Sequence, residues 1–109
     1  MISIIVDEGY AYDFLAILEI KGTTPNYHRT ISAYIEAQVG RNLHLEILMS
    51  EEFEKLIDAN EKTFNAVEMA RYGDISAKEV DKCNIERYNC KVALQNRFFP
   101  NQKFVETKT

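Results

Sequence analysis

The chain is poor in residues that break regular structure. It has only four Gly and two Pro among 109 residues, and it has no Trp. Loop-rich and sandwich architectures need many turns, so this scarcity favours long regular elements. Two Cys are too few for a disulfide scaffold. The longest apolar runs fall far short of the roughly 20 residues that cross a bilayer, so we expect no contact with membranes.

Motifs for catalysis and for metal binding are also missing. There is no Gly-x-Ser-x-Gly elbow, no cysteine beside a histidine, and no glycine-rich phosphate loop, because the glycines are scattered singly. His28 and His44 have no zinc-ligand spacing to the cysteines. We therefore expect no catalytic residue, no cofactor and no metal site, and we favour a function other than catalysis.

The net charge of the protein restricts the classes of molecule that it is expected to bind. The 17 acidic residues outnumber the 13 basic ones, which gives a net charge of −4 and a pI near 5.2. Nucleic-acid binding draws on an excess of cations, so we expect none. Residues 1–60 hold ten acidic and four basic side chains (−6), and residues 61–109 hold seven and nine (+2). These charges could be solvated helix faces, or they could steer self-association or a charged partner.

We expect no targeting segment in this chain. Residues 1–6 lack a basic segment and meet Asp7 too soon to form a signal peptide, so we expect a cytoplasmic protein. The same apolar residues, 2–6, could form a short strand or an extended arm. We expect one helical domain over residues 1–100, followed by a polar tail at 101–109.

The pattern of apolar residues predicts a mainly α fold, a small bundle of four or five helices. The first, from Glu8 to Lys21, is apolar almost all round, with Phe14, Leu15 and Leu18 on one face. The second starts at Thr24 and Pro25 and ends at Gly40. Residues 41–50 fit a strand or a helix, and we favour a helix because no partner strand is evident.

A helical hairpin is expected over residues 50–72 and 77–99. Ser50 can cap its first helix, and Gly73 can end it. Ser76 and Glu79 have the spacing of a capping box at the start of its second helix. A seam of apolar and small residues runs along the first helix, with one strongly polar member: Phe53, Leu56, Asn60, Thr63, Val67 and Ala70.

The last helix carries apolar residues on two separate arcs. One arc contains Val80, Cys83, Cys90, Leu94 and Phe98, and the other contains Ile85, Tyr88, Val92 and Phe99. A helix in a small monomer needs only one apolar face. Either the first helix or another subunit must therefore cover the second arc.

Several residues of the hairpin are candidates for an interface or a ligand site. Asn60 could fix the register of an oligomer or bond to nearby backbone. Arg87 lies within an apolar arc, so it either reaches to the surface or meets an anion. Cys83 and Cys90 lie about 10 Å apart on one face, too far for a disulfide within the helix; they are small buried residues or could bridge two subunits. The full set is Asn60, Arg71, Tyr72, Cys83, Arg87, Tyr88, Cys90, Leu94, Phe98 and Phe99.

Two classes of function follow. The first is a small non-enzymatic protein that self-associates and binds a protein partner, as an adaptor or inhibitor does. The second is an oligomer that sequesters a small anionic ligand, such as a nucleotide, between Tyr and Arg side chains of its subunits.

An enzymatic alternative concerns the acidic residues Glu51, Glu52 and Glu54. They superficially resemble the magnesium-binding Glu-Glu-x-x-Glu helix of the all-α nucleotide pyrophosphohydrolases, which implies a metal-dependent site on the Glu51–Glu61 surface. Lys55 stands where the third glutamate would be, and Glu79-Val80-Asp81 is not the second motif, Glu-x-x-Asp. Placement at a helix start also explains these acids.

Overall fold

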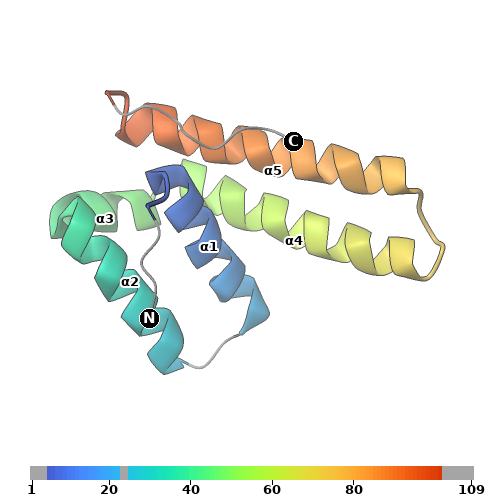
Figure 1. The fold of residues 1–109 in the computed structure, drawn as a ribbon, viewed down its shortest axis with the longest axis horizontal. Coiled ribbons are helices and arrows are strands. Elements are labelled where there is room, and N and C mark those ends of the chain that lie inside the picture. Colours follow the sequence, from blue (N-terminus) through green and yellow to red (C-terminus); the bar gives the residue numbers. More distant parts are fainter. Residues whose placement is uncertain (1–4, 23–24, 102–109) are drawn as a thin grey trace.

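The computed structural model describes residues 5–22 and 25–101, and this part of the chain forms five helices and no strand (Figure 1). The helices are α1 (Glu8–Lys21), α2 (Pro25–Val39), α3 (Arg41–Leu48), α4 (Glu51–Arg71) and α5 (Ala77–Phe98). The predicted all-α bundle and its C-terminal hairpin are confirmed, and residues 41–48 are helical as favoured. The arm at residues 2–6 lies largely outside the described residues, as does the tail beyond Asn101.

Local signals in the sequence set most of the helix ends. Gly22 ends α1 in the left-handed conformation, with φ of 62°. Pro25 opens α2, where its missing N–H leaves no donor unsatisfied; Thr24 lies outside the described residues. At α4 the Ser50 hydroxyl accepts a hydrogen bond from the Phe53 N–H at 3.2 Å.

The turn between α4 and α5 is a Schellman motif. Gly73 has φ of 79°, its N–H donates to the Ala70 carbonyl at 3.1 Å, and the Asp74 N–H donates to Met69 at 2.9 Å. The capping box predicted for α5 is wrong. Ser76 is the N-cap, but its hydroxyl makes no capping bond; the Glu79 N–H donates instead to the backbone carbonyl of Ser76 at 3.1 Å. Both side chains are exposed, so water can satisfy them.

The core lies at one end of the molecule, where α1 packs against α2, α4 and α5 while α3 joins α2 to α4. Its buried apolar residues are Tyr12, Leu15, Ala16, Leu18, Ile35, Ile47, Phe53, Leu56 and Leu94. Contact with three other helices explains why α1 is apolar almost all round. Phe14, expected beside Leu15 and Leu18, is instead 37% exposed.

The residues that are buried on α5 differ from those of the two predicted apolar arcs. Its buried residues are Lys91, Leu94 and Gln95. Lys91 and Gln95 lie between the arcs at 100° per residue, and α1 packs against α5 there: the Gly9 N–H donates to Gln95 Oε1 at 2.7 Å. The second arc is left partly open, since Ile85 is 42% exposed.

Candidate functional site

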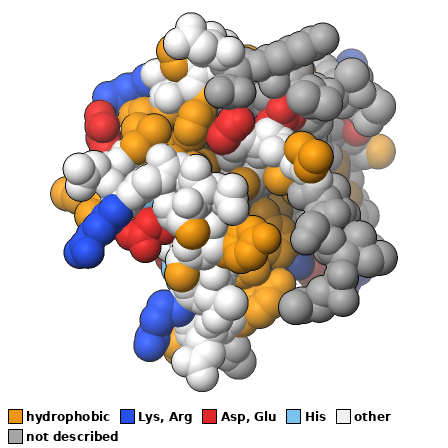
Figure 2. All heavy atoms as spheres, turned by 60° about the vertical axis from the view of Figure 1, so that its left-hand side comes forward, with side chains coloured by type: hydrophobic (Ala, Val, Ile, Leu, Met, Phe, Trp, Pro, Cys, Tyr) orange, Lys and Arg blue, Asp and Glu red, His pale blue; other side chains and the backbone are white. Residues whose placement is uncertain are grey.

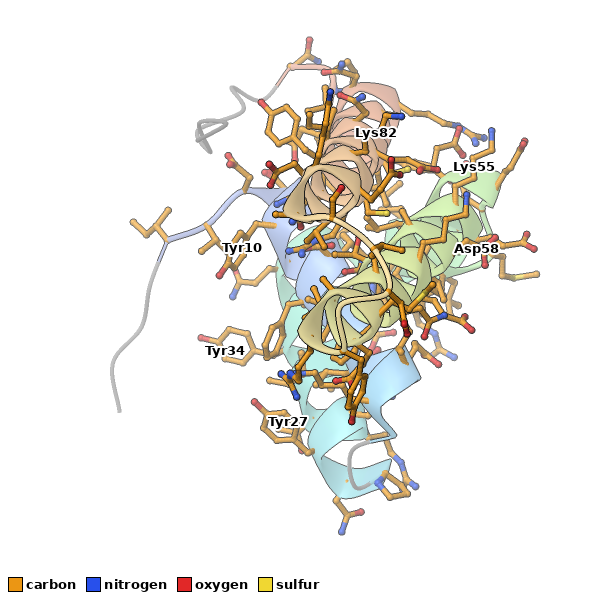
Figure 3. The ribbon with its side chains drawn as sticks, turned by 90° about the vertical axis from the view of Figure 1, so that its right-hand side faces the viewer. Tyr10, Tyr27, Tyr34, Lys55, Asp58 and Lys82 are labelled. Carbon is orange, nitrogen blue, oxygen red and sulfur yellow. The ribbon has the colours of Figure 1, made fainter. Side chains whose placement is uncertain are left out.

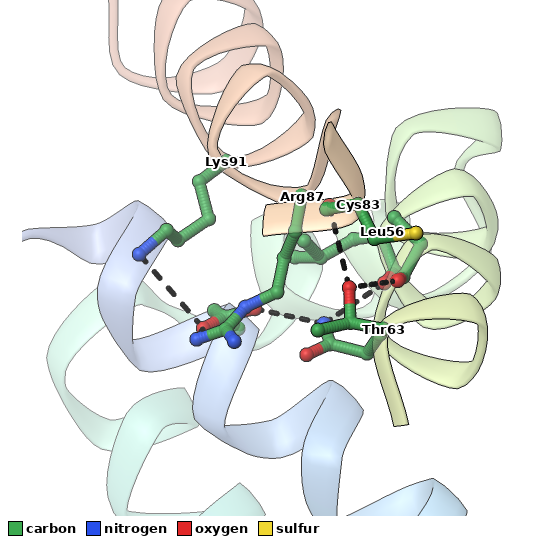
Figure 4. Close-up of polar contacts among 8 residues, drawn as sticks. Leu56, Thr63, Cys83, Arg87 and Lys91 are labelled. Carbon is green, nitrogen blue, oxygen red and sulfur yellow. Dashed lines mark hydrogen bonds and ion pairs between the residues drawn. The ribbon is translucent and has the colours of Figure 1, made fainter. Parts of the chain in front are cut away.

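A buried carboxylate, Asp13 on α1, links α1 to both helices of the hairpin (Figure 4). The residue is 3% exposed. Asn60 Nδ2 donates to its Oδ1 at 2.8 Å, and Arg87 Nη2 donates to its Oδ2 at 3.1 Å. Lys91 Nζ lies 3.9 Å from the same Oδ2 atom. A buried charge needs partners of this kind, so the cluster fixes how α1 sits on α4 and α5.

Asn60 and Arg87 both have partners within one chain. Asn60 donates to the Leu56 carbonyl at 2.9 Å as well as to Asp13, so it meets both nearby backbone and a distant helix. Arg87 meets an internal anion rather than only reaching to solvent, although its side chain remains 29% exposed. That exposed part of the guanidinium faces a groove.

This hairpin groove lies between the C-terminal part of α1 and the helices α4 and α5. It encloses about 340 Å³ and brings together three of the candidate residues, Asn60, Arg71 and Arg87. The remaining lining residues are Ile17, Lys21, Thr63, Phe64, Val67, Glu68 and Asn84. Residues separated by up to 70 positions in the sequence therefore meet at one site.

The hairpin groove carries more positive than negative charge. Its lining includes the cations Lys21, Arg71 and Arg87 and one carboxylate, Glu68, which lies 3.5 Å from Arg71 Nη1. Even when Asp13 behind Arg87 is counted, the cations remain in excess. The groove also offers amides and a hydroxyl for hydrogen bonds. Its apolar wall includes Phe64, whose ring lies 5.2 Å from the Lys21 ammonium.

Towards the turn between α4 and α5, the hairpin keeps large apolar side chains at its surface. We call residues 61–87 the outer hairpin. Exposed there are Phe64 (39%), Val67 (40%), Met69 (43%), Tyr72 (75%) and Ile85 (42%). Figure 1 shows this part of α4 and α5, with the turn that joins them, extending away from the other three helices. The predicted α4 seam is therefore buried at Phe53 and Leu56 but open at Val67.

The other candidate residues are dispersed. Leu94 is fully buried in the core, and Cys90, Phe98 and Phe99 pack against the core. Burial raises the pKa of the Cys90 thiol, so little of the reactive thiolate forms at neutral pH. Three residues lie outside both the core and the groove lining: Tyr72 is exposed, while Cys83 and Tyr88 are half-buried.

A second polar cluster, which the sequence reading missed, surrounds His44 on α3. The Tyr12 hydroxyl lies 2.8 Å from His44 Nδ1, and the Ser32 hydroxyl lies 3.0 Å from Nε2, so one imidazole joins α1, α2 and α3. The neutral ring donates one of these bonds and accepts the other. Burial lowers the pKa of His44, against an opposing effect of the nearby Glu36 carboxylate. Burial also raises the pKa of Tyr12.

Among the residues that the sequence reading missed, Asp13 did carry a signal and Lys21 did not. Asp13 is a charge in an otherwise apolar helical pattern, as Arg87 is on its own helix. Two such charges of opposite sign are best explained as partners, and this signal could have paired them. Lys21 gave no comparable signal, because a lysine in the last turn of a helix is ordinary.

In the described part of the chain, no group of three or more His, Cys, Asp or Glu is placed to hold a metal ion. Within the same residues, no helix is long and apolar enough to cross a bilayer. No protein-family model matches the chain, and neither a curated protein nor a solved structure shows significant similarity to it.

Proposed function

We propose that this chain is a non-enzymatic binding protein that self-associates through its outer hairpin and offers the resulting assembly to a protein partner. The observation that carries the proposal is that five large apolar side chains of the outer hairpin remain exposed, where α4 and α5 extend away from the other helices. Several exposed apolar side chains on one short hairpin favour protein association, whereas a single one is ordinary.

The occupant we infer for this surface is a second copy of the chain. Residues 61–87 carry six acidic and five basic side chains, so two copies would not repel one another strongly. A two-helix hairpin that packs against its own symmetry mate forms a four-helix arrangement. The same apolar residue then contributes to the interface from each of the two copies. Such an assembly leaves the core at the other end of each chain unchanged.

Light scattering coupled to size-exclusion chromatography tests the proposal, over a range of concentrations and with and without reductant. We expect a dimer or larger assembly that is insensitive to reductant, because the cysteines pack as small side chains. Val67→Glu and Ile85→Glu should each yield a monomer. Met49→Glu is the matched control, since Met49 is 87% exposed but lies outside the outer hairpin. A monomeric wild type at every concentration would contradict self-association.

A second candidate function is the capture of a small anion, which the positive lining of the hairpin groove favours. The ligand would contact Lys21 and Arg71 and the exposed part of the Arg87 guanidinium. Arginine and lysine suit phosphate groups in particular. The groove includes residues of the outer hairpin, so a second copy docked there would close over the bound ligand, as the sequestering hypothesis requires.

Thermal unfolding with inorganic pyrophosphate or ATP tests this second function. A ligand at a hundred times its dissociation constant stabilises the folded state by about 2.7 kcal/mol. Lys21→Ala and Arg71→Ala should abolish the shift, whereas Lys82→Ala, which removes an exposed lysine outside the groove lining (Figure 3), should retain it. Arg87→Ala is unsuitable, because it also removes a partner of Asp13. Absence of any shift would contradict anion capture.

A further inference from the structure

The helices α2 and α3 form the part of the fold that contributes least to the core. Among their residues, only Ile35, His44 and Ile47 are buried. The other three helices are joined to one another by the contacts of Asp13. Figure 2 turns the side of α2 and α3 towards the viewer, and hydrophobic side chains remain exposed on it. Segments with few buried apolar side chains open at a lower cost in free energy than the rest of a fold.

His44 is the polar link between these two helices and α1. It is 2% exposed, and its ring nitrogens face the hydroxyls of Tyr12 on α1 and Ser32 on α2. The Tyr12 ring is fully buried and packs edge-on against Phe53 of α4, with 6.2 Å between the ring centroids. Within the described chain, the Tyr12 hydroxyl has no hydrogen-bond partner other than His44. It therefore donates to Nδ1, and the neutral imidazole carries its proton on Nε2, facing Ser32.

Protonation of the imidazole disrupts this arrangement. Nδ1 becomes a donor, so the Tyr12 oxygen has to accept, and the Tyr12 proton is left without a partner in the core. The positive charge of the ring is also removed from water, which is unfavourable. The bond to Ser32 is unaffected, because Nε2 donates to it in either state.

The groups around the ring compensate only in part. On α2, the Glu36 carboxylate favours the protonated ring, but burial is the larger influence and lowers the pKa of the imidazole. On α1, burial raises the pKa of Tyr12, so its hydroxyl stays neutral. Arg41 and Glu46 on α3 are exposed, and α4 meets the cluster through the uncharged ring of Phe53. Protonation therefore weakens the contact of α2 and α3 with α1.

We propose that His44 is a pH-sensitive switch, whose protonation releases α2 and α3 from α1 while α1, α4 and α5 remain packed together. Opening at this point lets water solvate the imidazolium and pair with the Tyr12 hydroxyl. It also exposes the face of α1 against which α2 packs in the closed state. Tyr12, Ser32 and His44 lie outside the outer hairpin and the hairpin groove, so this inference is independent of the function proposed above.

Amide hydrogen exchange of the full chain, followed by two-dimensional NMR at about pH 7.5 and about pH 5.5, tests the switch. After correction for the intrinsic pH dependence of exchange, the protection factors of α2 and α3 should fall by up to about tenfold, because the released imidazole protonates near pH 6.5. The α2 and α3 amides should also be at least about tenfold less protected than those of the inner parts of α4 and α5. One common protection factor for all five helices, or unchanged factors in α2 and α3, would overturn the proposal.

Three substitutions test whether the effect comes from this ring. His44→Gln keeps an acceptor and a donor without a titratable proton, so it should remove the fall in protection. Glu36→Gln removes the carboxylate that favours the imidazolium, so the fall should come closer to its limit of about tenfold. Glu46→Gln, which removes an exposed carboxylate on α3, is the matched control and should behave as the wild type does. Equal falls in Glu36→Gln and Glu46→Gln, or a persisting fall in His44→Gln, would show that another group causes the opening.

Discussion

The inner and outer ends of the hairpin are built from the same two helices, yet they differ in what covers them. On the inner half of α4, Phe53 is 4% exposed and Leu56 is 0% exposed. On the outer half, Val67 on the same seam is 40% exposed, and Phe64 beside the seam is 39% exposed. The helical period is continuous across both halves. Periodicity therefore shows which face of a helix is apolar. The packing of the other helices decides which part of that face is covered.

Polar side chains also differ in their burial between the inner and outer ends of the hairpin. Buried networks around Asp13 and His44 join helices distant in sequence, and of the outer hairpin they include Arg87, at its inner limit. The outer hairpin holds surface pairs such as Lys62 with Glu86, whose side chains are 63% and 52% exposed. Buried polar networks fix one arrangement of the helices, whereas exposed ion pairs contribute little.

The largest expected effect contrasts two apolar truncations on α4. Leu56→Ala should lower the free energy of unfolding by about 3–4 kcal/mol, because it leaves a cavity in a fully buried site. Val67→Ala should lower it by less than about 1 kcal/mol. Urea unfolding at a concentration where the chain is monomeric measures both. Equal losses would show that the outer half of α4 is covered as fully as the inner half.

The next effect contrasts two ionic groups. Asp13→Ala should cost about 2–3 kcal/mol, because it leaves Asn60 and Arg87 without their acceptor in a largely buried site. The value lies below that for a fully buried pair because Arg87 is partly exposed. Glu86→Ala, which breaks the exposed pair with Lys62, should change stability by less than about 0.5 kcal/mol. A similar loss in both variants would contradict the structural role of Asp13.

A smaller effect concerns pH and the imidazole of His44. The unfolded chain protonates this ring near its usual pKa of about 6.5, whereas burial lowers the pKa in the folded state. Acidification then favours unfolding: the contribution is complete above about pH 6.5 and is lost as the pH falls towards the lowered pKa.

Thermal unfolding between about pH 7.5 and pH 5.5 measures this loss, and His44→Gln should reduce it. His28→Gln is the control, since His28 lies outside this cluster, with its Nε2 atom 2.9 Å from a Glu19 carboxylate oxygen. An unchanged pH dependence in His44→Gln would mean that another group causes the loss.

The smallest expected effects contrast the two serine caps of the hairpin. Ser50→Ala should cost about 1 kcal/mol, because its hydroxyl accepts from the Phe53 N–H and donates to the Ile47 carbonyl. Ser76→Ala should change stability by less than about 0.3 kcal/mol, because the Ser76 hydroxyl makes no capping bond. A loss of about 1 kcal/mol in Ser76→Ala would restore the capping box expected from the sequence.

Much of the fold could be predicted, because its signals are local. Gly22, Pro25, Ser50 and Gly73 lie at helix ends for reasons of backbone geometry that neighbouring residues alone decide. The candidate site could be predicted only in part. Asn60, Arg71 and Arg87 do line one groove, but Lys21 comes from a helix whose position no local pattern specifies, and Tyr72 and Tyr88 lie outside the groove lining.

Most helix ends in the described chain, and the apolar faces of its helices apart from α5, could be derived from the sequence alone. Those properties depend on residues within a few positions of one another. Three features depend on the tertiary structure: Asp13 meets Arg87, the turn end of the hairpin extends away from the other helices, and Lys21, Arg71 and Arg87 line one groove. These outcomes depend on the angles and offsets at which whole helices pack, and those are set by all of their contacts together.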